Sequence, residues 1–236
     1  MGRNSFQFKQ FTVNQDHCAM KVGTDGVLLG AWASAPERTC RILDIGTGTG
    51  LVALMMAQRY PKAFVWGIDI DSEAAKQAKD NVETSPFANR INILKGDATK
   101  LVDKIGFDAI VCNPPYFVDS LTSPYNQRTL ARHTICLTYE SLMQTVNKLL
   151  KNDGMFSVII PMENKELIVS YAALFELYIS RICNIKTTPN KPPKRLLIEF
   201  KKQYSNVIDF KEEVLDTAQN KRSKWYHELT KEFYIK

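Results

Sequence analysis

The stretch that sets the fold reads Leu43-Asp44-Ile45-Gly46-Thr47-Gly48-Thr49-Gly50. It ends an apolar run typical of a β-strand and is followed by a helix-like segment. Glycines at such a junction let backbone N–H groups approach a ligand closely. The stretch therefore predicts a nucleotide-type binding loop at the carboxyl end of a strand.

Two common glycine loops compete with this interpretation. A phosphate-binding P-loop is excluded because no Lys-Ser/Thr pair follows the glycines. A dinucleotide fingerprint is met formally by Gly48, Gly50 and Ala53, and stays open as an alternative. The arrangement Asp44-x-Gly46-x-Gly48-x-Gly50, with an acid before the first glycine, resembles the S-adenosylmethionine loop of class I methyltransferases. That resemblance implies a cofactor site formed by Asp44, Gly46, Thr47, Gly48 and Gly50, with the Asp44 carboxylate receiving the ammonium group.

Outward from this loop, short apolar runs alternate with longer helix-like segments, as in a parallel sheet covered on both faces. Predicted strands span 41–45, 64–69, 91–94, 109–112, 155–161, 179–186 and 195–201, and predicted helices span 51–60, 72–83, 139–150 and 164–177. The connection between the last two strands is too short for a parallel crossover, so they should form an antiparallel hairpin.

The predicted fold is therefore α/β. It is the Rossmann-like plan of class I methyltransferases, with a seven-stranded, mostly parallel sheet, a terminal antiparallel hairpin and a short N-terminal extension. The 236 residues, 44% of them hydrophobic, suffice for one such folded domain and exclude two large ones. We assign residues 1–40 to the extension, 41–202 to the S-adenosylmethionine-binding catalytic domain, and 203–236 to a tail that packs on or extends that domain.

Two further acids follow the next two strands. Asp69 ends the second strand, where an acid accepts hydrogen bonds from both ribose hydroxyls. We prefer it to Asp71, which precedes a predicted helix and is typical of a helix N-cap. Asp97, after the third strand, offers a carboxylate for the adenine amino group, although Gly-Asp is also ordinary turn chemistry. The neighbouring Ile70 and Ala98 complete the predicted cofactor set.

The motif that indicates the chemistry is Asn113-Pro114-Pro115-Tyr116, directly after the fourth strand. The lone pair of an exocyclic amine is delocalised into its ring, so this nitrogen is a poor nucleophile. The Asn113 side-chain oxygen and the next backbone carbonyl, at Pro114, could accept its two N–H groups, while Tyr116 stacks on the base. Asn113, Pro114 and Tyr116 are the predicted catalytic residues, with Asn113 also bordering the cofactor. A rigid proline turn is the structural alternative.

This tetrapeptide after a glycine loop resembles the amino-group methyltransferases, which act on adenine in DNA, guanine in ribosomal RNA or glutamine in peptide release factors. A planar amide poses the same nitrogen problem as a base, so the motif leaves these substrates open. A release-factor enzyme or an rRNA enzyme stays the alternative to a tRNA enzyme. A noncatalytic binding module and a dehydrogenase are further alternatives.

Four segments, at residues 16–32, 131–133, 192–197 and 232–234, are similar to the bacterial tRNA1(Val) adenine-37 amino-group methyltransferases. The resemblance covers nearly the whole chain and implies methyl transfer from S-adenosylmethionine to adenine N6 in tRNA, at position 37 beside the anticodon. It places Lys21, Thr24 and Asp25 at the cofactor pocket, with Lys21 as a cofactor contact. It also places Arg132 and His133 near the substrate entrance. Residues 24–26 could equally be a turn and helix cap, and residues 132–133 a plain surface.

The net charge of +6 is concentrated near the carboxyl terminus, where residues 191–236 carry 11 basic and 7 acidic side chains. A cluster suited to phosphate contacts lies at Lys186, Lys191, Lys194, Arg195, Lys201 and Lys202, with Glu199 as its one acid. Lys194 and Arg195 are the predicted substrate contacts in this cluster, although a solvated hairpin face is the alternative. The expected partner is the anticodon loop of a tRNA, whose bases are already unstacked.

The remaining sequence patterns concern the cellular location, metal binding and oligomeric state. Five scattered cysteines and the lack of an apolar leader or spanning segment favour a reducing cytoplasm and no membrane. We expect no metal, because no cluster of His and Cys has ligand spacing. The sequence leaves the oligomeric state open, with a monomer slightly favoured.

Overall fold

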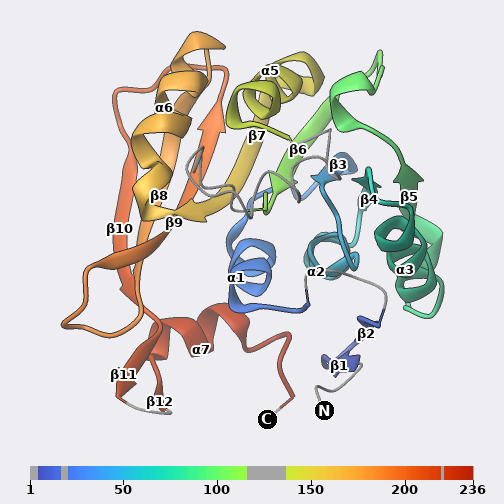
Figure 1. The fold of residues 1–236 in the computed structure, drawn as a ribbon, viewed down its shortest axis with the longest axis horizontal. Coiled ribbons are helices and arrows are strands. Elements are labelled where there is room, and N and C mark those ends of the chain that lie inside the picture. The colour runs from blue at the N-terminus through green and yellow to red at the C-terminus, as the bar shows by residue number, and fades with distance from the viewer. Residues whose placement is uncertain (1–4, 17–20, 116–136, 219–220, 236) are drawn as a thin grey trace, which may run out of the picture.

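A computed structural model of the chain describes residues 5–16, 21–115, 137–218 and 221–235. Its centre is an eight-stranded sheet in the order β10-β8-β9-β7-β6-β3-β4-β5 (Figure 1). The strands are β3 (Cys40–Ile45), β4 (Ala63–Asp69), β5 (Ile91–Lys95), β6 (Phe107–Cys112), β7 (Leu150–Pro161), β8 (Tyr178–Lys186), β9 (Pro193–Lys201) and β10 (Asp209–Val214).

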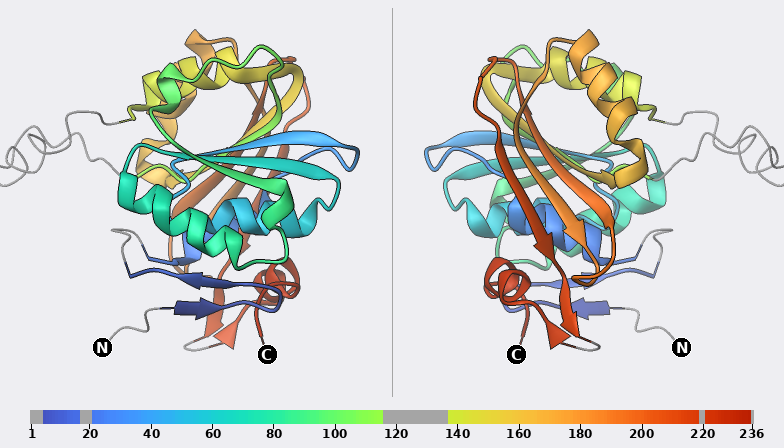
Figure 2. Two further views of the ribbon diagram at one scale, coloured as in Figure 1. Left: turned by 90° about the vertical axis from the view of Figure 1, so that its right-hand side faces the viewer. Right: turned by 90° about the vertical axis from the view of Figure 1, so that its left-hand side faces the viewer.

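Helices cover both faces of this sheet (Figures 1 and 2). One face carries α1 (Thr24–Trp32), α2 (Leu51–Arg59) and α3 (Ser72–Glu83), and the other carries α5 (Tyr139–Leu149) and α6 (Lys165–Leu174). Short 3-10 helices lie at Ala88–Arg90, Ala98–Lys100 and Met162–Asn164. Successive strand residues point to opposite faces, so in β9 Leu197 packs toward α1 and α2 while Leu196 and Ile198 pack toward α5 and α6.

The strand directions confirm the predicted hairpin. Strands β5, β4, β3, β6 and β7 run parallel, whereas β9 runs antiparallel to both β7 and β8. The predicted number of strands was wrong, because β10 adds an eighth strand parallel to β8. Its sequence, DFKEEV, lies largely exposed at the sheet edge and has no buried alternating face for a pattern to reveal.

Two predicted boundaries shift by three residues or more. Strand β7 begins at Leu150 rather than at residue 155, because Leu150 already pairs with Phe107 of β6. The polar residues 151–154 lie in a register shift before Met155 pairs with Ala109, so they carry no strand pattern. Helix α6 ends at Leu174 rather than at residue 177, and Glu176 beyond it has a φ of 54°. That left-handed conformation cannot continue a right-handed helix.

Segments from opposite ends of the chain form one cap beyond α1 and α2 (Figure 2). The cap contains the hairpin of β1 (Ser5–Gln7) and β2 (Thr12–Asn14), the pair β11 (Asp216–Ala218) and β12 (Lys221–Arg222), and α7 (Lys224–Thr230). Phe8, Tyr226 and Phe233 are buried in the core shared with α1 and α2. The Lys9 N–H donates to the Phe233 carbonyl at 2.8 Å, which ties the two ends together.

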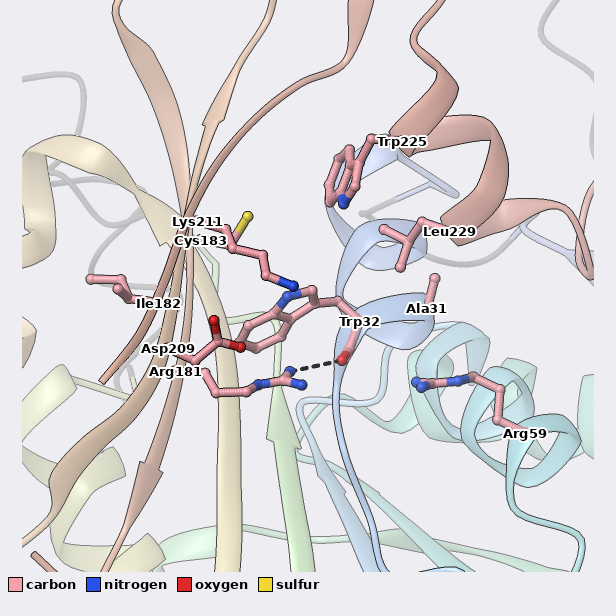
Figure 3. A pocket seen from close by; sticks show the side chains of 10 residues that line it. All are labelled: Ala31, Trp32, Arg59, Arg181, Ile182, Cys183, Asp209, Lys211, Trp225 and Leu229. Carbon is pink, nitrogen blue, oxygen red and sulfur yellow. Dashed lines mark hydrogen bonds between the residues drawn. The ribbon is translucent and has the colours of Figure 1, made fainter. Parts of the chain in front are cut away.

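Two arginines fix the carboxyl end of α1 (Figure 3). Arg59 donates to the carbonyls of Gly30 at 3.0 Å and Ala33 at 2.6 Å, and Arg181 donates to that of Trp32 at 3.0 Å. The Arg181 guanidinium also lies 3.9 Å from the centre of the Trp32 ring. The cavity of about 240 Å³ that they line is thus built around helix-end carbonyls, which attract cations.

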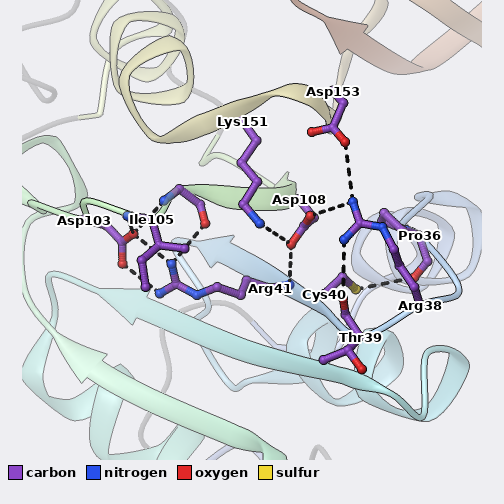
Figure 4. Close-up of polar contacts among 11 residues, drawn as sticks. Pro36, Arg38, Thr39, Cys40, Arg41, Asp103, Ile105, Asp108, Lys151 and Asp153 are labelled. Carbon is purple, nitrogen blue, oxygen red and sulfur yellow. Dashed lines mark hydrogen bonds and ion pairs between the residues drawn. The ribbon is translucent and has the colours of Figure 1, made fainter.

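An ionic network joins the starts of neighbouring strands, at the edge of the sheet opposite the glycine loop (Figure 4). The Asp108 carboxylate, which is 1% exposed, accepts from the Arg41 N–H at 2.8 Å and the Lys151 ammonium at 2.9 Å, and pairs with Arg38 at 3.1 Å. The Arg41 guanidinium holds the pKa of Asp103 well below its usual range. These contacts fasten the starts of β3, β6 and β7, and they leave the carboxyl edge for the site.

Candidate active site

A pocket of about 330 Å³ opens at the carboxyl ends of β3 and β6. Nine of the residues predicted at the site line it: Lys21, Thr24, Asp25, Asp44, Gly46, Thr47, Gly48, Asn113 and Arg195. Gly50, Asp69, Ile70, Asp97, Ala98, Pro114 and Lys194 do not line it. Tyr116, Arg132 and His133 lie outside the described residues. The topology explains the convergence, because carboxyl ends of parallel strands meet at one edge of a sheet.

The glycine loop requires its glycines. Gly46, Gly48 and Gly50 have φ values of 70°, 56° and 81°, in the left-handed region that L side chains rarely adopt. A Cβ atom at Gly46 or Gly48 would have no neighbour within 4 Å, so open space lies against the loop there. Gly50 instead packs on Ala78 of α3 and forms the N-cap of α2.

Three N–H groups of the glycine loop are engaged within the protein. The N–H groups of Gly46 and Thr47 donate to the Ile68 carbonyl at 2.9 and 3.1 Å, and that of Gly48 donates to the Asp69 carboxylate at 2.8 Å. These three donors bind the loop to β4. The loop therefore offers a ligand a shaped backbone surface and open space.

Asp44 is the buried acid of the pocket. Its side chain is 1% exposed and accepts from the Thr47 hydroxyl at 2.7 Å and the Ala53 N–H at 3.1 Å. Burial raises the pKa of Asp44 to about 7, against the effect of these hydrogen bonds and with a contribution from the nearby Asp69 charge. A cation placed beside this carboxyl group would favour its ionised form, and an ammonium group is a suitable partner.

Asp69 and Asp71 lie close together at the end of β4 but have different hydrogen-bond partners. Asp71 caps α3 by accepting from the N–H groups of Glu73 and Ala74 at 2.8 and 3.0 Å, which confirms its interpretation as a helix-start residue. Asp69 accepts from Gly48 and from the Asp71 N–H at 2.9 Å, and burial raises its pKa. Each carboxylate oxygen has a second lone pair, so Asp69 keeps capacity for hydroxyl donors.

Asp97 accepts hydrogen bonds within a turn, which was the alternative to its predicted role as a cofactor contact. One carboxylate oxygen accepts from the Thr99 N–H at 3.0 Å and the Thr99 hydroxyl at 2.7 Å, at the start of a 3-10 helix. The adjacent Ala98 is buried in the core, and Ile70 beside Asp69 is exposed. Cofactor contacts for these residues stay predictions.

Asn113 directly follows β6 and faces the pocket with an unsatisfied acceptor. Its Oδ1 atom is buried and has no hydrogen-bond partner among the described residues, and Pro114 beside it is buried. An unpaired buried acceptor costs about 1–3 kcal/mol, so a ligand that brings an N–H group relieves this cost. Gly26 of α1 lies close by, since a Cβ atom there would be 3.8 Å from Asn113 Nδ2.

The predicted basic cluster does not form one patch. Lys186 pairs with Glu212 of β10, and Glu199 is buried beside Arg181. Lys201 and Lys202 lie at the end of β9 opposite to Arg195, roughly 20 Å away at about 3.3 Å per residue. Because neighbouring strand residues alternate in direction, Lys194 and Arg195 also face opposite sides of β9.

One pair was missed by the sequence reasoning. The Arg195 Nε atom donates to the Asp25 carboxylate at 2.9 Å, and both side chains line the pocket while only 22% and 23% exposed. Arg195 therefore holds the start of α1 against β9, in addition to any contact with a substrate. The two residues are 170 positions apart, and no local pattern signals such a pair.

We expect the Asp25–Arg195 pair to show energetic coupling. In a double-mutant cycle with Asp25→Asn and Arg195→Gln, each single change should lower the free energy of unfolding, with a coupling of about 1 kcal/mol for this partly buried pair. Urea unfolding measures the cycle. The matched control is the exposed pair Lys79–Glu83, at 67% and 61% exposure, with a coupling below about 0.5 kcal/mol. Strictly additive effects at Asp25 and Arg195 would contradict the role given to the pair.

The fold is similar to those of solved methyltransferase structures. An Agrobacterium tumefaciens protein described as a predicted O-methyltransferase aligns with a TM-score of 0.71 and 21% identity, over 89% of this chain and 96% of that one. TrmN from Thermus thermophilus aligns with a TM-score of 0.52 and 17% identity, over 70% of this chain and 45% of that one. At these identities the likeness concerns the fold alone.

The fold and the site together define a class I S-adenosylmethionine-dependent methyltransferase. The model of the methyltransferase small domain matches residues 23–165. A relative from Bacteroides thetaiotaomicron is 51% identical over 100% of this chain and 99% of its own length, and one from Flavobacterium psychrophilum is 42% identical over 98% and 99%. Both are named tRNA1(Val) (adenine(37)-N6)-methyltransferase, and the chain belongs to the family of these enzymes.

Among the described residues, no group of three or more His, Cys, Asp or Glu side chains is arranged to hold a metal ion. Within the same residues, no helix is long and apolar enough to cross a membrane.

Proposed function

We propose that this protein transfers a methyl group from S-adenosylmethionine to the exocyclic N6 amino group of an adenine in tRNA, at position 37 beside the anticodon of tRNA1(Val). The observation that carries the proposal is the buried Asn113 Oδ1 atom, which has no partner in the described part of the chain and lies in the same pocket as the glycine loop and Asp44. The substrate is supported by the full-length relatives of that name.

The residues of the pocket fit the cofactor. Open space against Gly46 and Gly48 leaves room for a ligand along the loop. The buried Asp44 would hold an ammonium group and would be ionised by it. Beyond the lining of the pocket, Asp69 would accept hydrogen bonds from the ribose hydroxyls, and Asp97 would accept one from the adenine amino group. When bound, S-adenosylmethionine supplies a methyl group already activated by its sulfonium.

The chain's own residues would then act on the amine. Asn113 Oδ1 and the Pro114 carbonyl would each accept one N–H group, which favours a tetrahedral nitrogen with its lone pair directed at the methyl group. The Asn113 acceptor is buried, so its hydrogen bond is stronger than in water. Positioning and electrostatics account for the catalysis, and Tyr116 would stack on the base.

An anticodon loop suits this site, because its bases are unstacked and no duplex need be opened. Arg132 would contact the RNA near the entrance, with Lys194 and Arg195 near its backbone. We expect the enzyme to act as a monomer in the cytoplasm.

The direct test incubates the full chain with methyl-labelled S-adenosylmethionine and total tRNA from cells lacking the modification. We expect label in one tRNA species, recovered as N6-methyladenosine and mapped by nuclease digestion to position 37. Premethylated tRNA is the control and should take up no label. Label in a release factor instead would indicate glutamine methylation, and label in ribosomal RNA would indicate the rRNA alternative. Either result would refute the proposal.

A further inference from the structure

The cap formed by the two ends of the chain encloses a second cavity, of about 600 Å³, which we call the terminal groove. It lies between the β1–β2 hairpin, α7 and the segment that precedes α1. Val22, Gly23 and Thr24 line both this groove and the pocket that contains Asn113. A single short segment therefore separates the two cavities, and a ligand that extends beyond the pocket can reach the groove.

Cationic side chains and aromatic rings both contribute to its lining. The cationic side chains are Lys9, Arg222 and Lys231, and the rings include Phe6 and Tyr234, whose centroids lie 6.0 Å apart in an edge arrangement. This combination binds single-stranded nucleic acid, with charge for the phosphates and ring faces for the bases. Its volume lies within the range of about 300–1,000 Å³ typical of small-ligand sites, so it has room for a nucleotide.

Arg222 is the cation best placed for a phosphate. Its guanidinium lies 4.6 Å from the centre of the Tyr226 ring, which holds one face, while its side chain is 50% exposed. Tyr226 is itself 2% exposed and fixed by a 3.0 Å hydrogen bond between its hydroxyl and that of Tyr234. A stacked guanidinium on a fixed ring presents its N–H groups with little loss of conformational freedom.

Acidic neighbours partly balance these charges. Arg222 pairs with Asp216 at 3.0 Å and Lys231 pairs with Glu228 at 2.8 Å, while Glu232 also lines the groove. Exposed pairs of this kind contribute about 0–1 kcal/mol. A phosphate binds an arginine through two parallel charge-assisted hydrogen bonds, which are stronger, so it can compete for Arg222.

We propose that the terminal groove binds the backbone of the RNA strand next to the target adenine, with Arg222 and Lys9 contacting phosphate oxygens. This inference rests on the proposed function, since it requires an RNA substrate at Asn113. It gives the cap a role in substrate binding beyond packing on α1 and α2. It also gives two basic side chains near the carboxyl terminus, Arg222 and Lys231, a place beside the RNA.

The test compares Arg222→Gln and Lys9→Gln with the wild-type full chain on unmodified tRNA. We expect each change to raise the KM for tRNA about tenfold at moderate salt. The slope of log affinity against log salt concentration should fall by about 0.7 for each removed charge. Affinity for S-adenosylhomocysteine, measured by calorimetry, should stay at the wild-type value.

Two controls separate binding from folding. Lys79→Gln removes one charge from α3, where Lys79 is 67% exposed and pairs with Glu83, and should change neither KM nor salt slope. Arg222→Lys keeps the charge and should recover the salt slope, whereas a purely structural effect would lower the melting temperature without changing that slope.

If the wild-type chain methylates tRNA and Arg222→Gln and Lys9→Gln both keep its KM and salt slope, the terminal groove does not bind the RNA backbone. The proposed function would still stand. A wild-type chain that methylates no tRNA would overturn both. The two failures are therefore distinguishable in one series of measurements.

Discussion

Replacing Asn113 by alanine should lower kcat for methyl transfer by about 10²–10³-fold or more, while S-adenosylhomocysteine still binds. The change removes the buried Oδ1 acceptor that has no partner among the described residues. Because an unpaired buried acceptor is itself unfavourable, the free energy of unfolding should stay unchanged or rise. Single-turnover assays on unmodified tRNA, calorimetry and thermal unfolding measure the three quantities.

A matched control is available within the chain. Asn184 on β8 also has a buried Oδ1 atom without a partner in the described part of the structure, and it does not line the pocket. Asn184→Ala should therefore leave kcat at the wild-type value. Normal transfer by Asn113→Ala, or an equal loss in Asn184→Ala, would contradict the mechanism.

Replacing Asp44 by asparagine should weaken cofactor binding by about 2–5 kcal/mol, roughly 30- to 5,000-fold. Asparagine keeps the size of the side chain and one acceptor oxygen for Thr47 and Ala53, but it loses the charge that would hold the ammonium group. Asp108→Asn is the control, because Asp108 is equally buried at the opposite edge of the sheet. It should lower stability and leave cofactor affinity unchanged.

The same residue should make cofactor affinity depend on pH. Burial raises the pKa of Asp44 to about 7, so in the unliganded protein the carboxyl group is protonated below that pH. An ammonium ligand favours the carboxylate, and binding must then release a proton. The Kd should therefore rise as pH falls below 7, by up to about tenfold per unit, and level off above it.

Calorimetry between pH 5.5 and 8.5 in buffers of different ionisation enthalpy measures both the affinity and the released proton. The Asp44→Asn variant should lose the part of the pH dependence that titrates near 7. An unchanged profile in that variant would assign the proton to another group and refute this role of Asp44.

The glycine loop and the sheet could be predicted because their requirements are local. Gly46, Gly48 and Gly50 need left-handed backbone angles, and the apolar runs of β3 and β6 are buried on both faces. Asp71 was recognised as a cap because its partners lie two and three residues ahead. Asn113 could be placed at the site because a strand's carboxyl end is fixed by the order of the elements.

Other features could not be predicted from local patterns. Strand β10 is held by pairing with β8, and its exposed, charged sequence carries no alternating apolar face. The N–H groups of Gly46, Thr47 and Gly48 donate to β4, whose distance from the glycine loop the sequence does not give. The basic cluster appeared continuous in the sequence, yet β9 spreads it along its length and over two faces.

The sequence by itself determined the class of fold, the strand-end acids and the Asn113 turn, because these depend on side-chain periodicity and backbone angles within a few residues. Only the tertiary structure decided what surrounds them. It paired Asp25 with Arg195, fixed the end of α1 with Arg59 and Arg181, and joined both chain ends into the terminal groove. Such contacts join residues far apart in sequence, and they follow from how the layers pack.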